Sequence, residues 1–285
     1  MILSERANMM KATATGGRVP NTRLRRIEGR HNPLVKELRA AFSRGELISD
    51  GYCAIEGFRI LEEALRSGLR FRAVFFSESA TPRADRLLSQ LGAQVETLLL
   101  PDKLFSSAVP SDAPQGVAAL ARWKEFALED VLAKSPAGPI LVIAGVQDPG
   151  NLGTILRSAE AFGAGGIVLG RGTVSPYNPK VVRASAGSVF RLPVARAKLS
   201  ESLGAMKDHS LRLVGTASHQ GTPLDQAKLS GPLAIFIGSE GAGLSRDLIK
   251  EMDEVVAIPQ APQVESLNVG VATSIVLYEV ARQRR

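Results

Sequence analysis

The chain has 285 residues, of which 45% are hydrophobic and 5% aromatic, and it carries a formal net charge of +7. This length fits two domains of ordinary size, each with its own core. The few aromatic residues disfavour a broad surface for stacking bases, whereas the positive charge favours an anionic partner, nucleic acid above all. No apolar run approaches the roughly 18 residues that a transmembrane helix needs, and no apolar signal-peptide core opens the chain. We therefore expect a cytoplasmic protein without a membrane segment.

Cysteine and histidine are scarce. Cys53 is the only cysteine, which excludes a disulfide framework and a thiolate zinc cluster. The histidines His31, His209 and His219 are scattered along the chain. The sequence therefore predicts no metal site.

Residues 1–26 are predicted to be a basic, flexible tail. Residues 1–31 hold seven lysines and arginines against two glutamates, so most of the net charge lies there. Two interpretations stay open, a solubilising extension and an arm that grips RNA.

Residues 27–122 read as a small α/β domain. Helical patterns occupy residues 32–42, 58–68, 82–92 and 101–109, and strand patterns occupy residues 51–57, 71–77, 93–99 and 115–122. A Pro/Gly-rich joint containing one helix follows, which predicts a linker over residues 123–138.

Residues 139–285 read as a second α/β domain. Strands are expected at 140–146, 166–170, 211–217, 233–239 and 254–259, and helices at 151–162, 178–190, 199–208, 244–252 and 266–284. The strands are nearly continuous apolar runs, which indicates a parallel sheet covered by helices on both faces. Because such sheets bind ligands beyond the carboxyl ends of their strands, a site is expected in the loops there.

The first such loop precedes the stretch NLGTILRSAEAFG. Asn151 suits the N-cap of the predicted helix, and Arg157 lies in the second turn among small and apolar residues. The pattern fits a site at the strand ends. Taken alone, it fits better a capped surface helix with a solvated arginine.

The second loop is IGSEGAGLS, in which Gly238, Gly241 and Gly243 allow the backbone to approach a ligand and Glu240 supplies an acid. It lacks the Gly-Lys-Ser/Thr ending of a phosphate loop, the pattern of a nucleophile elbow and the dinucleotide fingerprint. The alternative is a flexible turn capped by Ser245.

The third loop is IPQAPQVESLNVGVATSIVLYE. A strand ends at Ile258, and a polar segment leads to Ser266, a plausible N-cap for the last helix, and Asn268. A capped C-terminal helix docked on the sheet accounts for part of this pattern. It does not account for a serine and an asparagine together at the strand ends.

Together, the three segments resemble the signature motifs of the SpoU/TrmH RNA ribose methyltransferases of the SPOUT superfamily. The stretches NPLVKELR, AIEGFRILEEAL and PQGVAALA more loosely resemble the substrate-binding domain often found upstream in this family, whose fold is like that of a ribosomal RNA-binding protein. The resemblance implies a trefoil-knotted α/β domain with a parallel sheet, S-adenosylmethionine as cofactor, and a homodimer formed through the methyltransferase domain.

The resemblance also implies roles for individual residues. The matching catalytic positions are Asn151, Arg157, Glu240, Ser266 and Asn268. The matching cofactor-binding positions are Thr216, Ala217, Ser218, Gly238, Ile258 and Leu267. Arg183 and Arg191 are candidates for contact with RNA phosphates, or else solvated surface charges. Gly270 departs from the family pattern, which often has a serine there.

The expected function is transfer of a methyl group from S-adenosylmethionine to a ribose 2′-hydroxyl of structured RNA, ribosomal RNA before transfer RNA. Arg157 either relays the proton or holds a phosphate. Arginine side chains are poor bases, because the guanidinium group keeps its protons. The alternatives are a transfer-RNA methyltransferase, a non-catalytic RNA-binding or ribosome-assembly protein, and an enzyme that methylates a base nitrogen. A nucleotide-dependent oxidoreductase is disfavoured because the fingerprint is missing.

Overall fold

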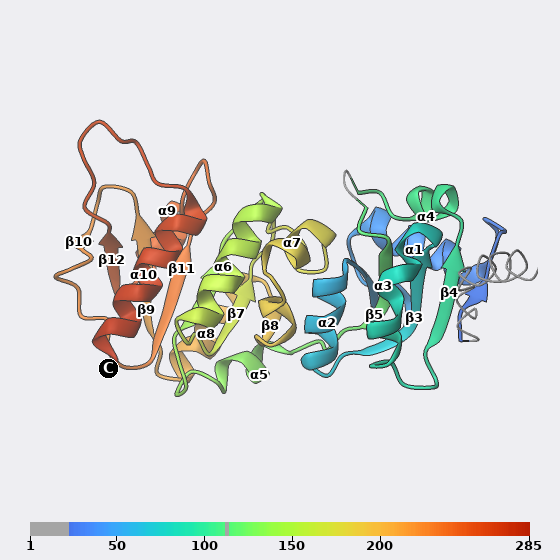
Figure 1. The fold of residues 1–285 in the computed structure, drawn as a ribbon. Helices are drawn as coiled ribbons and strands as arrows, with labels where there is room; N and C mark the ends of the chain where they lie inside the picture. Colours follow the sequence, from blue (N-terminus) through green and yellow to red (C-terminus); the bar gives the residue numbers. More distant parts are fainter. Residues whose placement is uncertain (1–22, 112–113) are drawn as a thin grey trace, which may run out of the picture.

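The structure is a computed structural model that describes residues 23–111 and 114–285. Two sheets divide the chain, one built from residues 25–122 and the other from residues 140–257 (Figure 1). No helix within these described ranges is long and apolar enough to cross a membrane.

The first sheet is mixed and has five strands in the order β1-β4-β3-β5-β2. Its strands are β1 (Arg25–Arg26), β2 (Tyr52–Glu56), β3 (Arg70–Ser77), β4 (Glu96–Leu100) and β5 (Val117–Arg122). β1, β4 and β3 are parallel, and β5 runs antiparallel to both β3 and β2. Short β1 was not predicted.

Helices cover both faces of this sheet. They are α1 (Pro33–Arg44), α2 (Phe58–Arg66), α3 (Thr81–Leu88) and α4 (Asp102–Ala108). Strand alternation divides the core, because Phe75 of β3 packs with α1 and α4 and its neighbour Phe76 packs with α2 and α3. The structure therefore has an N-terminal α/β domain, as the fold class predicted.

The start of this domain differs from the predicted boundary. Arg25 pairs with Leu98 in β1, so the end of the predicted tail belongs to the sheet. The Arg23 guanidinium donates hydrogen bonds of 2.7 and 2.9 Å to the carbonyls of Leu88 and Leu91. Residues 1–22 of the predicted tail lie outside the described residues.

The second sheet has seven strands in the order β10-β12-β9-β11-β6-β7-β8, and every adjacent pair is parallel. Its strands are β6 (Ile140–Ile143), β7 (Gly166–Leu169), β8 (Val194–Arg196), β9 (Arg212–Ala217), β10 (Thr222–Pro223), β11 (Leu233–Ile237) and β12 (Glu254–Ala257). The predicted parallel sheet is confirmed. Edge strands β8 and β10 were not predicted.

Helices also cover both faces of the second sheet. They are α5 (Leu128–Leu132), α6 (Pro149–Ala161), α7 (Pro179–Ala184), α8 (Leu199–Asp208), α9 (Arg246–Lys250) and α10 (Val269–Gln283). Leu141 of β6 belongs to the core under α6 and α10, whereas Val142 belongs to the core under α5 and α8. Figure 1 shows α6 and α10 side by side, and Ser158 and Ser274 join them by a hydroxyl hydrogen bond of 2.7 Å.

One predicted helix is wrong in extent. The segment 178–190 contains α7 and a separate 3-10 turn, Ser188–Phe190. Ala186 (φ 51°) and Gly187 (φ 92°) adopt left-handed backbone conformations between them, which ends the α-helix.

Candidate active site

Loops from one edge of the second sheet enclose a cavity of about 560 Å³. It lies beyond the ends of β9, β11 and β12, where an open parallel sheet binds ligands, and the first turns of α10 close one side. All six predicted cofactor-binding residues line it: Thr216, Ala217, Ser218, Gly238, Ile258 and Leu267. The structure thus brings together segments that are distant in the sequence.

The glycine-rich loop after β11 folds back on itself at this cavity. Ser239 and Gly243 exchange backbone hydrogen bonds of 3.2 and 3.1 Å. A Cβ at Gly238 would lie 2.1 Å from the carbonyl carbon of Gly243, so the loop can close only over a glycine. At Gly241, by contrast, a Cβ would meet no atom of residues 23–111 and 114–285 within 4 Å.

Glu240 ties this loop to the start of α6. Its carboxylate accepts hydrogen bonds from the backbone amides of Gln147 (3.2 Å) and Asp148 (3.1 Å) and from the side-chain amide of Asn151 (3.1 Å). Partial burial raises the pKa of the Glu240 carboxyl. The hydrogen bonds, from Asn151 first, outweigh this effect and hold the pKa below its ordinary value. The carboxylate therefore acts as an anionic acceptor here.

Asn268 connects the third loop to the same group. Its side-chain nitrogen donates to the side-chain oxygen of Asn151 at 2.8 Å. Its side-chain oxygen accepts from the backbone amides of Gly270 (2.9 Å) and Val271 (3.2 Å). Glu240, Asn151 and Asn268 thus form one hydrogen-bonded chain across the three motifs.

Two predicted helix caps are wrong. Asp148 caps α6 by accepting from the Asn151 backbone amide at 2.8 Å, so Asn151 lies inside the first turn. Asn268, and not Ser266, caps α10. In both cases another polar residue of the same segment caps the helix. Asn151 is thus left to join the hydrogen-bonded chain, and Ser266 is left to line the cavity.

The other two predicted catalytic residues lie nearby. Ser266 lines the cavity beside Asn268. Arg157 is exposed on α6, does not line the cavity, and makes no side-chain hydrogen bond or ion pair within residues 23–111 and 114–285. Its guanidinium is therefore available to a bound molecule.

The two predicted RNA-binding arginines lie against the first domain. Arg191 binds Glu160 and Glu63, and Arg183 lies 3.4 Å from the Ser111 hydroxyl. Phosphate contact by these arginines stays a prediction, and the structure gives Arg191 two carboxylate partners.

Gln260 was missed by the sequence reasoning. It lines the cavity, and its amide nitrogen donates to the Ser218 carbonyl at 3.0 Å. Its amide oxygen is buried and has no hydrogen-bond partner among the described residues. A buried orphan acceptor indicates a place for a ligand donor, such as an amino group. The only signal in the sequence is its position three residues beyond the end of β12.

The cavity is lined by polar and small side chains. No group of three or more His, Cys, Asp or Glu side chains in the described part of the chain is arranged to hold a metal ion. The cavity is lined by small side chains, by Glu240 and Glu265, and by the unsatisfied amide oxygen of Gln260, which fits a cationic organic molecule with amino groups.

Comparison with known proteins matches both parts of the chain. The SpoU rRNA Methylase family matches residues 138–278, and the MRM3-like substrate binding domain matches residues 32–119. The chain is 32% identical over 257 residues to the 23S rRNA (guanosine(2553)-2′-O)-methyltransferase RlmP of Bacillus subtilis, covering 90% of this chain and 99% of that protein.

Solved structures agree. The crystal structure of an AdoMet-bound rRNA methyltransferase from Sinorhizobium meliloti superposes with a TM-score of 0.80 at 29% identity, covering 91% of this chain and 98% of that one. The SpoU methyltransferase AviRb from Streptomyces viridochromogenes, in complex with AdoMet, gives a TM-score of 0.76 at 27% identity, covering 88% and 98%. With the three motifs joined at one cavity, these matches show that the chain belongs to the SpoU rRNA methylase family.

Proposed function

We propose that this protein transfers a methyl group from S-adenosylmethionine to a ribose 2′-hydroxyl of structured RNA, and that the RNA is ribosomal. One observation carries the proposal: hydrogen bonds join Glu240, Asn151 and Asn268 next to the cavity. All six residues expected to bind the cofactor line that cavity. The AdoMet bound to the Sinorhizobium relative and the ribosomal substrate named for the Bacillus relative support it.

The cavity residues hold the cofactor in this proposal. When bound, S-adenosylmethionine supplies a methyl group already activated by its sulfonium charge. Gly238 would let the loop backbone close on the cofactor, and the orphan oxygen of Gln260 would accept a hydrogen bond from a cofactor amino group. The protein's remaining task is to orient the ribose oxygen and help remove its proton.

Arg157 holds the RNA in this proposal. Its exposed guanidinium, on the helix that carries Asn151, suits bidentate contact with a phosphate beside the target ribose. The proton then passes to that phosphate or to water, because a guanidinium holds its protons and is a poor acceptor. Relay of the proton through Arg157 is the competing route.

The proposal includes a homodimer formed through α10. Val271, Ile275 and Tyr278 form an exposed apolar stripe at positions i, i+4 and i+7 of this helix. Such a stripe next to a catalytic group suits a second copy of the same face. A trefoil knot in the second domain and a cytoplasmic location complete the proposal, and family membership supports both.

Transfer of labelled methyl from S-adenosylmethionine to separated ribosomal and transfer RNA pools tests the function. Nuclease digestion then identifies the methylated nucleoside. We expect 2′-O-methylated nucleosides in the ribosomal pool. Arg157→Ala is expected to lower the rate at least about 100-fold with unchanged cofactor affinity, because Arg157 lies outside the cavity.

Lys207→Ala is the matched control, since it removes an exposed helical cation that pairs with Glu251 on another surface. Label in the transfer RNA pool alone would overturn the ribosomal assignment. Label on bases would overturn the ribose assignment. Cofactor binding without transfer to any RNA, including ribosome assembly intermediates, would favour the RNA-binding alternative.

A further inference from the structure

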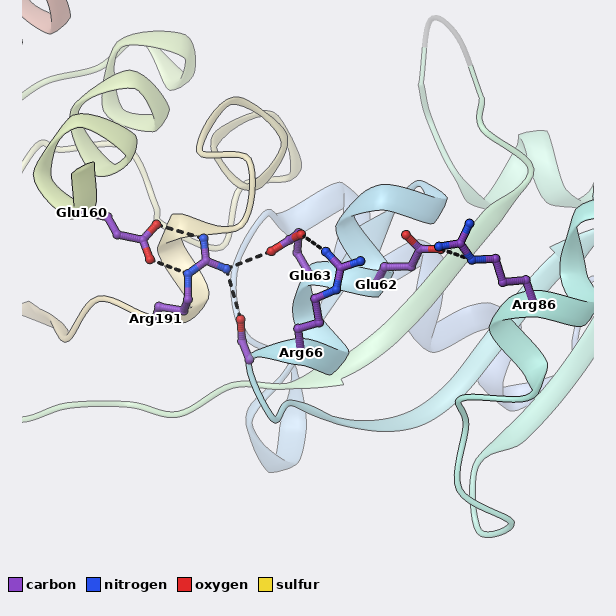
Figure 2. Close-up of polar contacts among 7 residues, drawn as sticks. Glu62, Glu63, Arg66, Arg86, Glu160 and Arg191 are labelled. Atoms are coloured by element: carbon purple, nitrogen blue, oxygen red, sulfur yellow. Dashed lines mark hydrogen bonds and ion pairs between the residues drawn. The ribbon is translucent and has the colours of Figure 1, made fainter.

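Arg191 bridges the two domains (Figure 2). On one side, its Nε and Nη2 both donate to the carboxylate of Glu160 on α6, and the bond from Nη2 is 2.9 Å long. On the other side its Nη1 donates to Glu63 of α2 at 3.0 Å and to the hydroxyl of Ser67 at 3.3 Å. One guanidinium thus binds a helix of each domain.

The local backbone permits this close approach. Arg191 follows the 3-10 turn that Gly187 begins with its left-handed conformation. A Cβ at Gly187 would lie 2.8 Å from the Cβ of Glu63, so a larger residue would push α2 away. The turn therefore presents Arg191 to α2 at short range.

Other contacts cross the same boundary. Trp123, at the start of the predicted linker, packs edge-on against two rings of the second domain. Its ring centroid lies 5.1 Å from that of Tyr177 and 5.4 Å from that of Phe190. Arg196 forms an ion pair of 2.9 Å with Glu46. One cluster of buried apolar residues also includes members of both domains. Arg191 thus belongs to an extended contact between the domains.

The charges at Arg191 favour a persistent bridge. Its side chain is 37% exposed, and those of Glu63 and Glu160 are 29% and 31% exposed. The hydrogen bond from Arg191 is the main cause that lowers the pKa of Glu160. Bidentate and partly buried pairs are stronger and more specific in geometry than exposed ones.

We propose that Arg191 is a positioning residue that fixes the RNA-binding domain against α6, the helix that carries Asn151 and Arg157. An RNA held by the first domain then meets the catalytic end of α6 in one register. This inference rests on the proposed function. It assigns Arg191 to protein carboxylates and not to an RNA phosphate.

The neighbouring ion pairs supply matched controls. Arg86 pairs with Glu62 at 3.5 Å and Arg66 with Glu63 at 2.6 Å, and both pairs lie within the first domain (Figure 2). Arg86 lies on α3, and its partner Glu62 lies on α2, the helix that also carries Glu63. Arg86→Gln therefore removes an ion pair to α2 that does not involve the second domain. Any change that this variant makes in the interdomain distances or in RNA kinetics is the change that follows from losing an arginine charge alone.

Distance measurement between spin labels tests the positioning directly. Ser106→Cys on α4 and Ser230→Cys before β11 place exposed labelling sites in the two domains. Cys53 is buried and burial raises the pKa of its thiol, so it stays unlabelled. We expect Arg191→Gln and Glu63→Gln to broaden the interdomain distance distribution, and Arg86→Gln to leave it unchanged.

Kinetics on the RNA substrate supply the second readout. We expect Arg191→Gln to raise KM for RNA about tenfold with kcat and cofactor affinity nearly unchanged, because an unfixed domain loses pre-organisation. Arg191→Lys restores only part of this loss, since lysine cannot bind two carboxylates with a planar fork.

The outcomes separate the alternatives. An unchanged distance distribution in both Arg191→Gln and Glu63→Gln overturns the inference, even if KM rises. In that case, a salt dependence of RNA binding reduced by about one counterion would assign Arg191 to a phosphate. The distance experiment needs no substrate, so it also decides the inference if the intact protein fails to methylate RNA.

Discussion

Asn268 and Asn151, 117 positions apart in the chain, are joined side chain to side chain by a hydrogen bond of 2.8 Å. The amide of Asn268 performs two tasks, because its oxygen caps α10 while its nitrogen binds Asn151. The bond therefore couples the start of the last helix to the start of α6 and, through Asn151, to Glu240.

Asn268→Asp separates these two tasks. A carboxylate keeps the acceptors that cap α10 but places an oxygen against the Asn151 oxygen, where the donor was. We expect the free energy of unfolding to fall by about 1 kcal/mol, the cost of one lost hydrogen bond, and kcat/KM for RNA to fall at least about tenfold. Asn268→Ala loses the cap as well, which costs about 1 kcal/mol more. Parental activity in Asn268→Asp, measured beside urea unfolding, would rule out a role for the bond.

Two glycines of one loop are expected to behave differently. Gly238→Ala places a Cβ against backbone atoms and is expected to weaken cofactor binding at least about tenfold and to destabilise by about 1–3 kcal/mol. Gly241→Ala has open space and no positive φ, so we expect nearly parental binding. Titration calorimetry with S-adenosylmethionine measures both. Equal affinities of the two variants would show that the close approach at Gly238 is unimportant.

Glu240→Gln is expected to change how stability depends on pH. The pKa of Glu240 in the folded protein lies below its ordinary value, so the carboxylate stabilises the fold above about pH 5 and this contribution is lost as pH falls through the folded pKa. A glutamine would turn a donor toward amides that already donate. The parent is expected to exceed the variant in melting temperature at pH 7, with the gap narrowing on acidification. A gap that is constant with pH would contradict this account.

Ile275→Glu is expected to convert the protein to a monomer. It puts a charge in the middle of the apolar stripe on α10, where a second copy would bury it. Val264→Glu is the control, because Val264 is equally exposed but lies in the loop before that helix. Light scattering coupled to size exclusion measures the mass of each. A parental protein that is already a monomer at micromolar concentration would refute the proposed dimer.

The sequence predicted the strands that are buried along their whole length, such as β6, β7 and β11, because a short continuous apolar run between turn residues is typical of a buried strand. It missed β1, β8 and β10, which are two or three residues long and show no periodicity. The placement of the helix caps failed where two capping residues compete within one segment. Proline favours the first position of a helix, so Pro149 indicates Asp148 as the cap in place of the predicted Asn151.

The six residues expected at the cofactor site all line one cavity, because each of their loops follows a recognisable strand. The partners of Arg191 could not be predicted, because Glu63 and Glu160 lie on helices whose packing depends on both domains. Gln260 was missed for a similar reason. An unpaired amide oxygen is a property of the folded surroundings and leaves no pattern in the residues themselves.

The parallel order of the second sheet bears on how fast the site can form. Asn151 meets Glu240 across 89 positions and Asn268 across 117, so the loops must close before these contacts can repay the lost chain entropy. Such high contact order slows folding. On dilution from denaturant, helical signal is therefore expected to recover before the ability to bind cofactor, which makes cofactor binding a reporter of the last folding step.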